Sequence, residues 1–116
     1  MQNSKNFYIN GEWVAASSNN KLPVVNPANE KVICEISLGN ISDLEKAVDA
    51  AKKAFITYSE STRDERLFLF DNIINVYKKR MNDLSDAITL EMGAPKSLSE
   101  KAQAPSGLGH FMQMKK

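Results

Sequence analysis

The sequence has one cysteine, Cys34, and one histidine, His110, among its 116 residues. A single thiol excludes an intramolecular disulfide, and two such residues are too few for a Cys/His zinc site. No stretch approaches the roughly 20 consecutive apolar residues that cross a bilayer, so no contact with a membrane interior is expected. The opening residues lack the basic region and apolar core of a secretory signal. These absences favour a reducing, cytoplasmic location.

The sequence also lacks a large net charge of either sign. Fifteen Lys and Arg residues oppose fourteen Asp and Glu residues, which leaves a formal charge of +1. Such a balance creates no long-range field that would attract nucleic acid or an anionic membrane, so neither is expected as a partner. The hydrophobic content of 42% and charged content of 25% are typical of a globular protein.

Two short antiparallel strand pairs are predicted before residue 40. Asn10-Gly11 separates two apolar runs, and this dipeptide is the strongest short hairpin signal because both positions tolerate a positive φ. A second pair is predicted to join residues 22–25 to residues 32–38 around a turn at residues 26–30. Alternation with period two places four residues on one face of the later strand: Val32, Cys34, Ile36 and Leu38.

Three helical segments are predicted after the strands. Residues 42–45 and 62–65 each form a capping-box pattern, which marks the start of a helix. The first helix carries apolar residues at helical spacing from Leu44 to Phe55, and the second is expected to break or re-cap at Asn82 and to end before Gly93. Residues 97–100 offer a third box, but Pro105 and two glycines follow, so a kinked or broken last helix is expected.

The predicted fold class is therefore α/β, with short hairpin strands followed by three helical segments and without a main sheet. Residues 1–39 hold the strands and turns and residues 42–114 are mainly helical, which together form a single incomplete segment. Isolated hairpins are marginal without a covering surface. Part of the apolar helix surface is therefore expected to face residues that the chain does not contain.

The reactive side chains give few functional signals. Cys34 is either a nucleophile or a small buried hydrophobe, and its apolar strand face without a basic neighbour favours the second. His110 is interpreted as solvated or capping. Residues 107–109 (GLG) follow no predicted strand and lack a third glycine, so a dinucleotide loop is discounted. The basic run at residues 78–80 is interpreted as a solvated helix face.

Glu91 stands out because it is an anion in the last turn of a predicted helix, where the helix dipole mildly disfavours negative charge. Either a nearby cation or solvation would relieve this conflict. The residue alone does not decide between the two.

The chain resembles the N-terminal segment of the NAD(P)-dependent aldehyde dehydrogenase family. The residues that carry the resemblance occur in family order: 8–14 (YINGEWV), 25–30 (VNPANE), 32–33, 38–39, 43, 47–48, 50–51, 54–55, 63, 65–66, 90–93 (LEMG) and Pro95. Family members are several times longer, and Asn29 and Ala94 depart from the usual threonine and lysine. The resemblance implies that the nucleotide-binding sheet and the catalytic cysteine and glutamate all lie outside these residues.

What the resemblance implies for the whole enzyme is oxidation of an aldehyde with NAD or NADP through a cysteine thiohemiacetal and thioester, in a homo-oligomer. It assigns no catalytic or cofactor-binding residue to this chain, so the segment alone is expected to be inactive. It also implies a monovalent cation held by the main-chain carbonyl of Val24 or Val25 and by the Glu91 carboxylate.

Two other interpretations remain open: a small stand-alone interaction module, and a truncated remnant without function. The burial of one apolar stripe shows whether the segment needs a partner. If Leu67, Phe70, Ile74 and Tyr77 pack within the chain, that stripe needs no partner, whereas a large exposed apolar patch indicates a missing domain or a binding partner.

Overall fold

The computed structural model describes residues 3–115. The chain divides into two compact units. The first contains residues up to Val25 together with Lys31–Glu60, and the second contains Asn26–Glu30 together with the residues from Ser61 onward. Within residues 3–115, no helix combines the length and apolar character that crossing a membrane requires.

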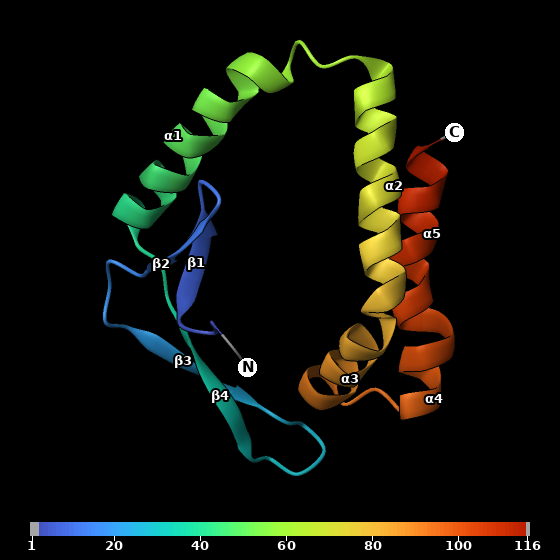
Figure 1. Cartoon of the computed structure of the whole chain (residues 1–116). Helices are drawn as coiled ribbons and strands as arrows, with labels where there is room; N and C mark the ends of the chain where they lie inside the picture. The colour runs from blue at the N-terminus through green and yellow to red at the C-terminus, as the bar shows by residue number, and fades with distance from the viewer. Residues whose placement is uncertain (1–2, 116) are drawn as a thin grey trace. The chain divides into compact units, whose positions relative to one another are not determined.

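The first unit opens with the predicted hairpin (Figure 1). Strands β1 (Asn6–Ile9) and β2 (Glu12–Ala15) pair in antiparallel fashion. Asn10 and Gly11 have φ values of 54° and 83°, which confirms the positive-φ turn. Tyr8 and Trp13 are cross-strand partners whose rings meet edge to face at a centroid distance of 5.3 Å.

The second strand pair is also confirmed, but its predicted face is only partly correct. Strand β3 (Lys21–Val25) pairs with β4 (Val32–Ser37) in antiparallel fashion. The register shifts between Val24, opposite Cys34, and Val25, opposite Val32, so Ile33 falls between the pairs. Such a bulge interrupts the period of two. Cys34 and Ile36 are half-buried as expected, whereas Val32 is 60% exposed.

Helix α1 (Ile41–Tyr58) begins earlier than predicted. Its N-cap is Asn40, whose side chain accepts the Asp43 amide at 3.1 Å, while the Asp43 carboxylate accepts the Asn40 amide at 3.1 Å. The box predicted at residues 42–45 is therefore wrong. Asparagine is as good an N-cap as serine. Asn40 therefore caps the helix, Asp43 takes the place of glutamate at the third position, and Ser42 lies inside the helix.

The second unit is helical. Helix α2 (Arg63–Lys79) has the predicted cap, in which the Thr62 hydroxyl accepts the Glu65 amide at 3.2 Å and the Glu65 carboxylate accepts the Thr62 amide at 2.7 Å. Helix α3 (Met81–Met92) follows directly, so the break predicted at Asn82 lies at Arg80. Gly93 ends α3 with a φ of 73°, which confirms the glycine C-cap.

The last helical stretch is interrupted, as predicted. It runs through α4 (Lys96–Leu98), a π-helical turn η1 (Ser99–Gln103) and α5 (Ala104–Met114). Pro105 has no N–H to offer the Lys101 carbonyl, and the wider π turn accommodates that loss. The third capping box is wrong, because the helix starts at Lys96 without a side-chain cap.

Helices α2 and α5 run antiparallel and side by side (Figure 1). The Phe111 ring lies 6.3 Å from that of Phe70 and 5.9 Å from that of Tyr77. Ile74 is buried and the Tyr77 hydroxyl donates to the Ala104 carbonyl at 2.8 Å. Leu67, Phe70 and Tyr77 are half-buried, so the α2 stripe is only partly covered within the chain.

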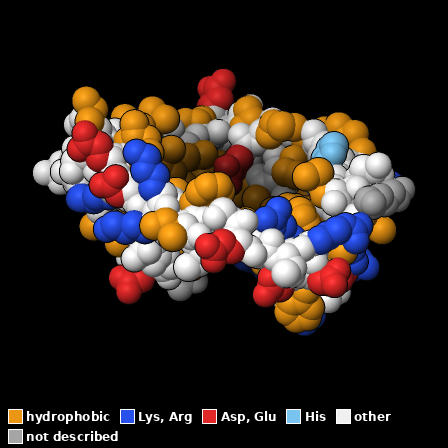
Figure 2. Space-filling model, turned by 90° about the horizontal axis from the view of Figure 1, so that it is seen from above, with side chains coloured by type: hydrophobic (Ala, Val, Ile, Leu, Met, Phe, Trp, Pro, Cys, Tyr) orange, Lys and Arg blue, Asp and Glu red, His pale blue; other side chains and the backbone are white. Residues whose placement is uncertain are grey.

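Other apolar side chains remain exposed (Figure 2). Phe68 on α2 is 68% exposed, and on α1 Ile41, Leu44 and Phe55 are each more than 60% exposed. Among the described residues, buried hydrophobic side chains are few: Ile74, Ala94 and Ala104. Short strand pairs followed by helices, with no larger sheet in residues 3–115, confirm the predicted fold class.

Candidate functional site

The three residues predicted to hold a cation belong to two elements, strand β3 and helix α3. Val24 and Val25 are the last residues of β3 in the first unit, and Glu91 lies in the last turn of α3 in the second.

At the β3 end, the register shift separates Val24 from Val25. A bulge disrupts the regular ladder locally and leaves backbone groups less well paired. The extra residue is Ile33 on β4, and Val24 and Val25 each keep a partner on that strand. Val24 is half-buried and Val25 is 42% exposed.

Glu91 is exposed and has no ion-pair partner among the described residues. Its position at the negative end of α3 matches the sequence prediction. In residues 3–115, His, Cys, Asp and Glu side chains do not gather in groups of three or more that could hold a metal ion.

The turn after Val25 packs against the end of α3 within the second unit. Asn26 organises it: its side chain accepts the Ala28 amide and its carbonyl accepts the Glu30 amide, both at 2.8 Å. A Cβ placed on Gly93 would lie 2.7 Å from Pro27 Cγ. The turn that begins directly after Val25 therefore lies against the residue that caps the helix carrying Glu91.

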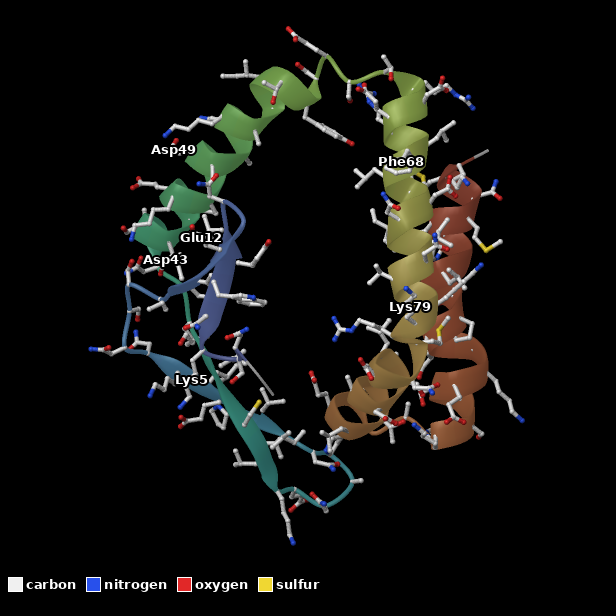
Figure 3. The ribbon with its side chains drawn as sticks, in the orientation of Figure 1. Lys5, Glu12, Asp43, Asp49, Phe68 and Lys79 are labelled. Atoms are coloured by element: carbon white, nitrogen blue, oxygen red, sulfur yellow. The ribbon has the colours of Figure 1, made fainter. Side chains whose placement is uncertain are left out.

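Asp43 is a buried polar residue whose contact with Ser17 the sequence did not predict (Figure 3). It is 5% exposed, and its carboxylate accepts the Ser17 amide at 3.0 Å in addition to the Asn40 amide. Hydrogen bonding to Ser17 lowers the pKa of Asp43, with the Asn40 amide and the Lys46 charge acting in the same direction. The Asn-x-x-Asp spacing could have revealed the cap, but no local signal pointed to Ser17.

A buried hydroxyl cluster joins α3 to the π turn. The Ser99 hydroxyl lies 3.0 Å from that of Ser85 and 2.8 Å from that of Thr89, and it donates to the Lys96 carbonyl at 2.9 Å. Lys96 is paired with Asp86 and Glu100, and its hydrogen bond to Asp86 raises the pKa of the Lys96 ammonium. These contacts are structural, since each hydroxyl is satisfied by the others.

The structure gives no functional role to the remaining candidate residues. Cys34 is half-buried on β4, and His110 is exposed on α5. Gly107 and Gly109 lie inside α5 and form no loop. The basic run at residues 78–80 is exposed, with Arg80 paired to Asp83 at 3.2 Å.

Comparison with known proteins decides the family. The model of the aldehyde dehydrogenase family matches residues 13–114, which is most of the chain. The chain belongs to the aldehyde dehydrogenase family. It corresponds to the N-terminal segment of that family, as the ordered residues of the sequence predicted.

Individual aldehyde dehydrogenases show how far the match extends. A Staphylococcus epidermidis protein whose name assigns it to the aldehyde dehydrogenases is 47% identical over 111 residues, or 96% of this chain. The crystal structure of a Bartonella henselae aldehyde dehydrogenase matches 97% of the chain at 40% identity with a TM-score of 0.93. Aldehyde dehydrogenase C from Pseudomonas syringae, solved with NAD+ and octanal, matches 95% at 34% identity, also with a TM-score of 0.93.

These aldehyde dehydrogenases are much longer than the chain, which spans 23% of the Staphylococcus epidermidis protein and 24% of the Bartonella henselae one. The short strand pairs and helices are thus the aldehyde dehydrogenase fold over about a quarter of its length. The Pseudomonas syringae enzyme binds NAD+ in a chain of which this segment covers 23%.

Proposed function

We propose that these residues are the N-terminal segment of a longer NAD(P)-dependent aldehyde dehydrogenase, which oxidises an aldehyde to a carboxylic acid. The observation that carries the proposal is a family match from residue 13 to 114 in a chain about a quarter as long as its relatives. In this view residues 1–116 are one incomplete segment of the enzyme's N-terminal domain, and its helices brace the cofactor-binding part.

In the whole enzyme, a cysteine thiolate outside this segment attacks the aldehyde carbon, and an oxyanion hole stabilises the tetrahedral thiohemiacetal. Hydride transfer to oxidised nicotinamide then leaves a thioester, which water hydrolyses to the acid and the free thiolate. Cys34 takes no part, because it lies half-buried in an apolar strand pair on β4. We therefore propose that the segment alone is inactive.

The test is NADH formation from NAD+ and octanal. The purified 116-residue chain should form no NADH above the enzyme-free control, whereas a longer polypeptide that continues into the remaining family sequence should do so. Turnover by the short chain would refute its inactivity, and a Cys34→Ala variant would then show whether that thiol is responsible. A longer polypeptide without activity on any aldehyde would contradict the proposed reaction.

For the longer enzyme we also propose a monovalent cation bound by the Val24 or Val25 carbonyl and the Glu91 carboxylate. The Glu91 carboxylate supports it, because it lies in the last turn of α3 and forms no ion pair among the described residues. Potassium in place of choline should raise the melting temperature of the longer enzyme. Glu91→Gln should remove that difference, and Glu45→Gln, an exposed change on α1, should retain it. An equal effect of potassium on all variants would contradict the site.

The longer enzyme is further proposed to be a cytoplasmic homo-oligomer, which sedimentation of the longer polypeptide and fractionation of cells would test. A stand-alone interaction module is the second candidate, favoured by exposed Phe68 on α2 and Phe55 on α1. It predicts that cells contain the short chain bound to another protein.

A further inference from the structure

The tip of the first hairpin exposes an asparagine directly before a glycine. Asn10 and Gly11 are both exposed, and a Cβ placed on Gly11 would meet no atom within 4 Å apart from its chain neighbours. The last pair of the ladder between β1 and β2 is Ile9 with Glu12, so the Gly11 amide lies outside that ladder. No hydrogen bond within residues 3–115 holds the Asn10 side chain. Its amide group is therefore open to attack.

The backbone of this turn allows the Gly11 nitrogen to reach the Asn10 side chain. The φ values are 54° at Asn10 and 83° at Gly11, as in a type I′ turn, and a type II′ turn also holds its first central residue at a positive φ. The two turns differ in the orientation of the peptide between their central residues. Flipping that peptide turns the Gly11 nitrogen toward the side chain while the strands stay in place. Glycine permits the flip because it adopts either sign of φ.

Other asparagines of the chain lack this combination. Asn10 is the one asparagine in the sequence that a glycine follows, so no side chain on the next residue hinders the approach. Asn26 is followed by Pro27, which has no N–H, and its side chain accepts the Ala28 amide at 2.8 Å. Asn40 is engaged as the N-cap of α1. A reaction between side chain and following amide is therefore expected to select Asn10.

Positive charge lies beside the hairpin tip. A hollow of about 330 Å³ in the first unit is lined by Asn10 and by three charged residues of α1, which are Lys46, Asp49 and Lys53. Two ammonium groups oppose one carboxylate there, so negative charge that develops at Asn10 meets a net positive neighbourhood. Exposed charges of opposite sign attract weakly. The hollow therefore favours a reaction that builds negative charge at the tip.

We propose that Asn10 is a modification site, at which spontaneous deamidation through a cyclic imide creates a carboxylate beside Lys46 and Lys53. The Gly11 N–H gives its proton to solvent, and the nitrogen forms a bond to Asn10 Cγ. The bond between Cγ and Nδ2 then breaks, and ammonia leaves. Water opens the imide: cleavage between the Gly11 nitrogen and Cγ gives aspartate, and cleavage between that nitrogen and the backbone carbon gives isoaspartate. The step consumes water and needs no oxidant or reductant.

The two products differ in their effect on the hairpin. Aspartate tolerates a positive φ as asparagine does, so the turn is kept. Isoaspartate runs the backbone through the side chain and adds one carbon to the connection, which displaces the pairing of Ile9 with Glu12 because loop length fixes the register of a hairpin. Deamidation therefore adds one negative charge at the tip and, in the isoaspartate form, opens the end of the ladder.

The test follows deamidation in the natural sequence by peptide mass spectrometry. The 116-residue chain and the longer polypeptide are incubated at neutral pH in water enriched in heavy oxygen. Asn10 should take up one heavy oxygen and give both aspartate and isoaspartate, well before Asn20 reacts. Asn20 is the internal control, because it is equally classed as exposed but is followed by Lys21. Equal rates at the two sites, aspartate as the sole product, or an unreactive Asn10 in the longer polypeptide would each overturn the proposal.

A pair of variants tests the role of the hollow. Lys53→Gln should slow deamidation of Asn10 by up to about fivefold, the effect expected of an exposed charge interaction, and salt at about 1 M should abolish the difference. Lys52→Gln is the matched control, because Lys52 is exposed on the same helix and does not line the hollow. Lys46 is left in place, since it also donates to the Ser17 hydroxyl at 2.9 Å. Equal rates in the two variants would overturn the contribution of the hollow.

Discussion

Gly107 occupies a position in α5 where any side chain would collide with α2. A Cβ built there would lie 2.2 Å from the Tyr77 hydroxyl oxygen and 3.0 Å from Cζ of the same ring. The ring cannot retreat without losing its hydrogen bond to the Ala104 carbonyl and its contact with Phe111. The lack of a side chain at Gly107 therefore allows α5 to pack closely against α2.

Gly107→Ala should lower the free energy of unfolding of the second unit by roughly 1–3 kcal/mol, the usual effect of overpacking. Gly109→Ala is the matched control in the same helix, because no atom lies within 4 Å of its added Cβ. It should raise stability by about 0.5–1 kcal/mol through helix propensity. Urea unfolding followed by circular dichroism compares the two. Stabilisation by both changes would contradict the packing of Tyr77 on Gly107.

Asp43 links three segments of the first unit through one carboxylate. Its pKa is lowered, first by hydrogen bonding to Ser17. A group with a lowered folded pKa stabilises the fold above its unfolded pKa of about 3.9, and the stabilisation is lost as pH falls through the folded value. The Ser17 amide should therefore lose its protection only at pH values below that unfolded pKa.

Amide exchange of Ser17, corrected for intrinsic rates and followed by NMR, measures this loss. Asp43→Asn places an amide group against two N–H donors and should raise the exchange rate at neutral pH. Asp49→Asn, an exposed change on the same helix (Figure 3), should leave it unaltered. A Ser17 rate that is unaffected by Asp43→Asn would show that the 3.0 Å contact does not hold the loop.

At the scale of elements, the contact between the turn at Asn26–Glu30 and the end of α3 is set by Pro27 and Gly93. Gly93 has two reasons to lack a side chain: its φ is 73°, and Pro27 Cγ occupies the space of a Cβ. A left-handed alanine costs about 1–2 kcal/mol, and displacing the proline adds to that penalty.

A double-mutant cycle separates the two effects. Gly93→Ala should destabilise the second unit more in the natural sequence than in a Pro27→Ala background, where only the backbone penalty of about 1–2 kcal/mol remains. The coupling between the two positions should be about 1 kcal/mol, as for residues in direct contact. Additive effects in urea unfolding would show that the turn does not rest on the helix end.

Elements governed by neighbouring residues were predictable. The Asn10-Gly11 turn, the Thr62 cap and the Gly93 end each depend on a few adjacent positions, and the structure has all three. The cap of α1 was misplaced by two residues because Asn40 and Ser42 compete for one role. Local preference alone does not rank such neighbours.

Contacts between residues far apart in the sequence could not be predicted from local sequence patterns. The bulge at Ile33, the hydrogen bond from Ser17 to Asp43 and the contact of Pro27 with Gly93 each join residues whose pairing depends on the whole fold. For the candidate cation site, the sequence located Glu91 at a helix end, and only the structure revealed the bulge beside Val24 and Val25. The pairing of these ligands came from family resemblance and stays a proposal.

At the scale of the whole molecule, the chain combines well-formed local structure with uncovered apolar surface. Ring contacts pack α5 against α2, yet Val76 on α2 and Phe55 on α1 are each more than half exposed to solvent. Monomeric proteins rarely leave large contiguous apolar patches uncovered without a binding role. A quarter-length segment of a longer enzyme accounts for both features.

The mass of the polypeptide in cells tests this most directly. An antibody raised against the second unit should detect, in denaturing gels of cells that encode the sequence, a band about four times heavier than 12.9 kDa, because the chain spans 23% of its relative. Peptides from both the segment and the remaining family sequence should be found in that band. A single band at 12.9 kDa, with no heavier product, would contradict the claim that the segment belongs to a longer aldehyde dehydrogenase.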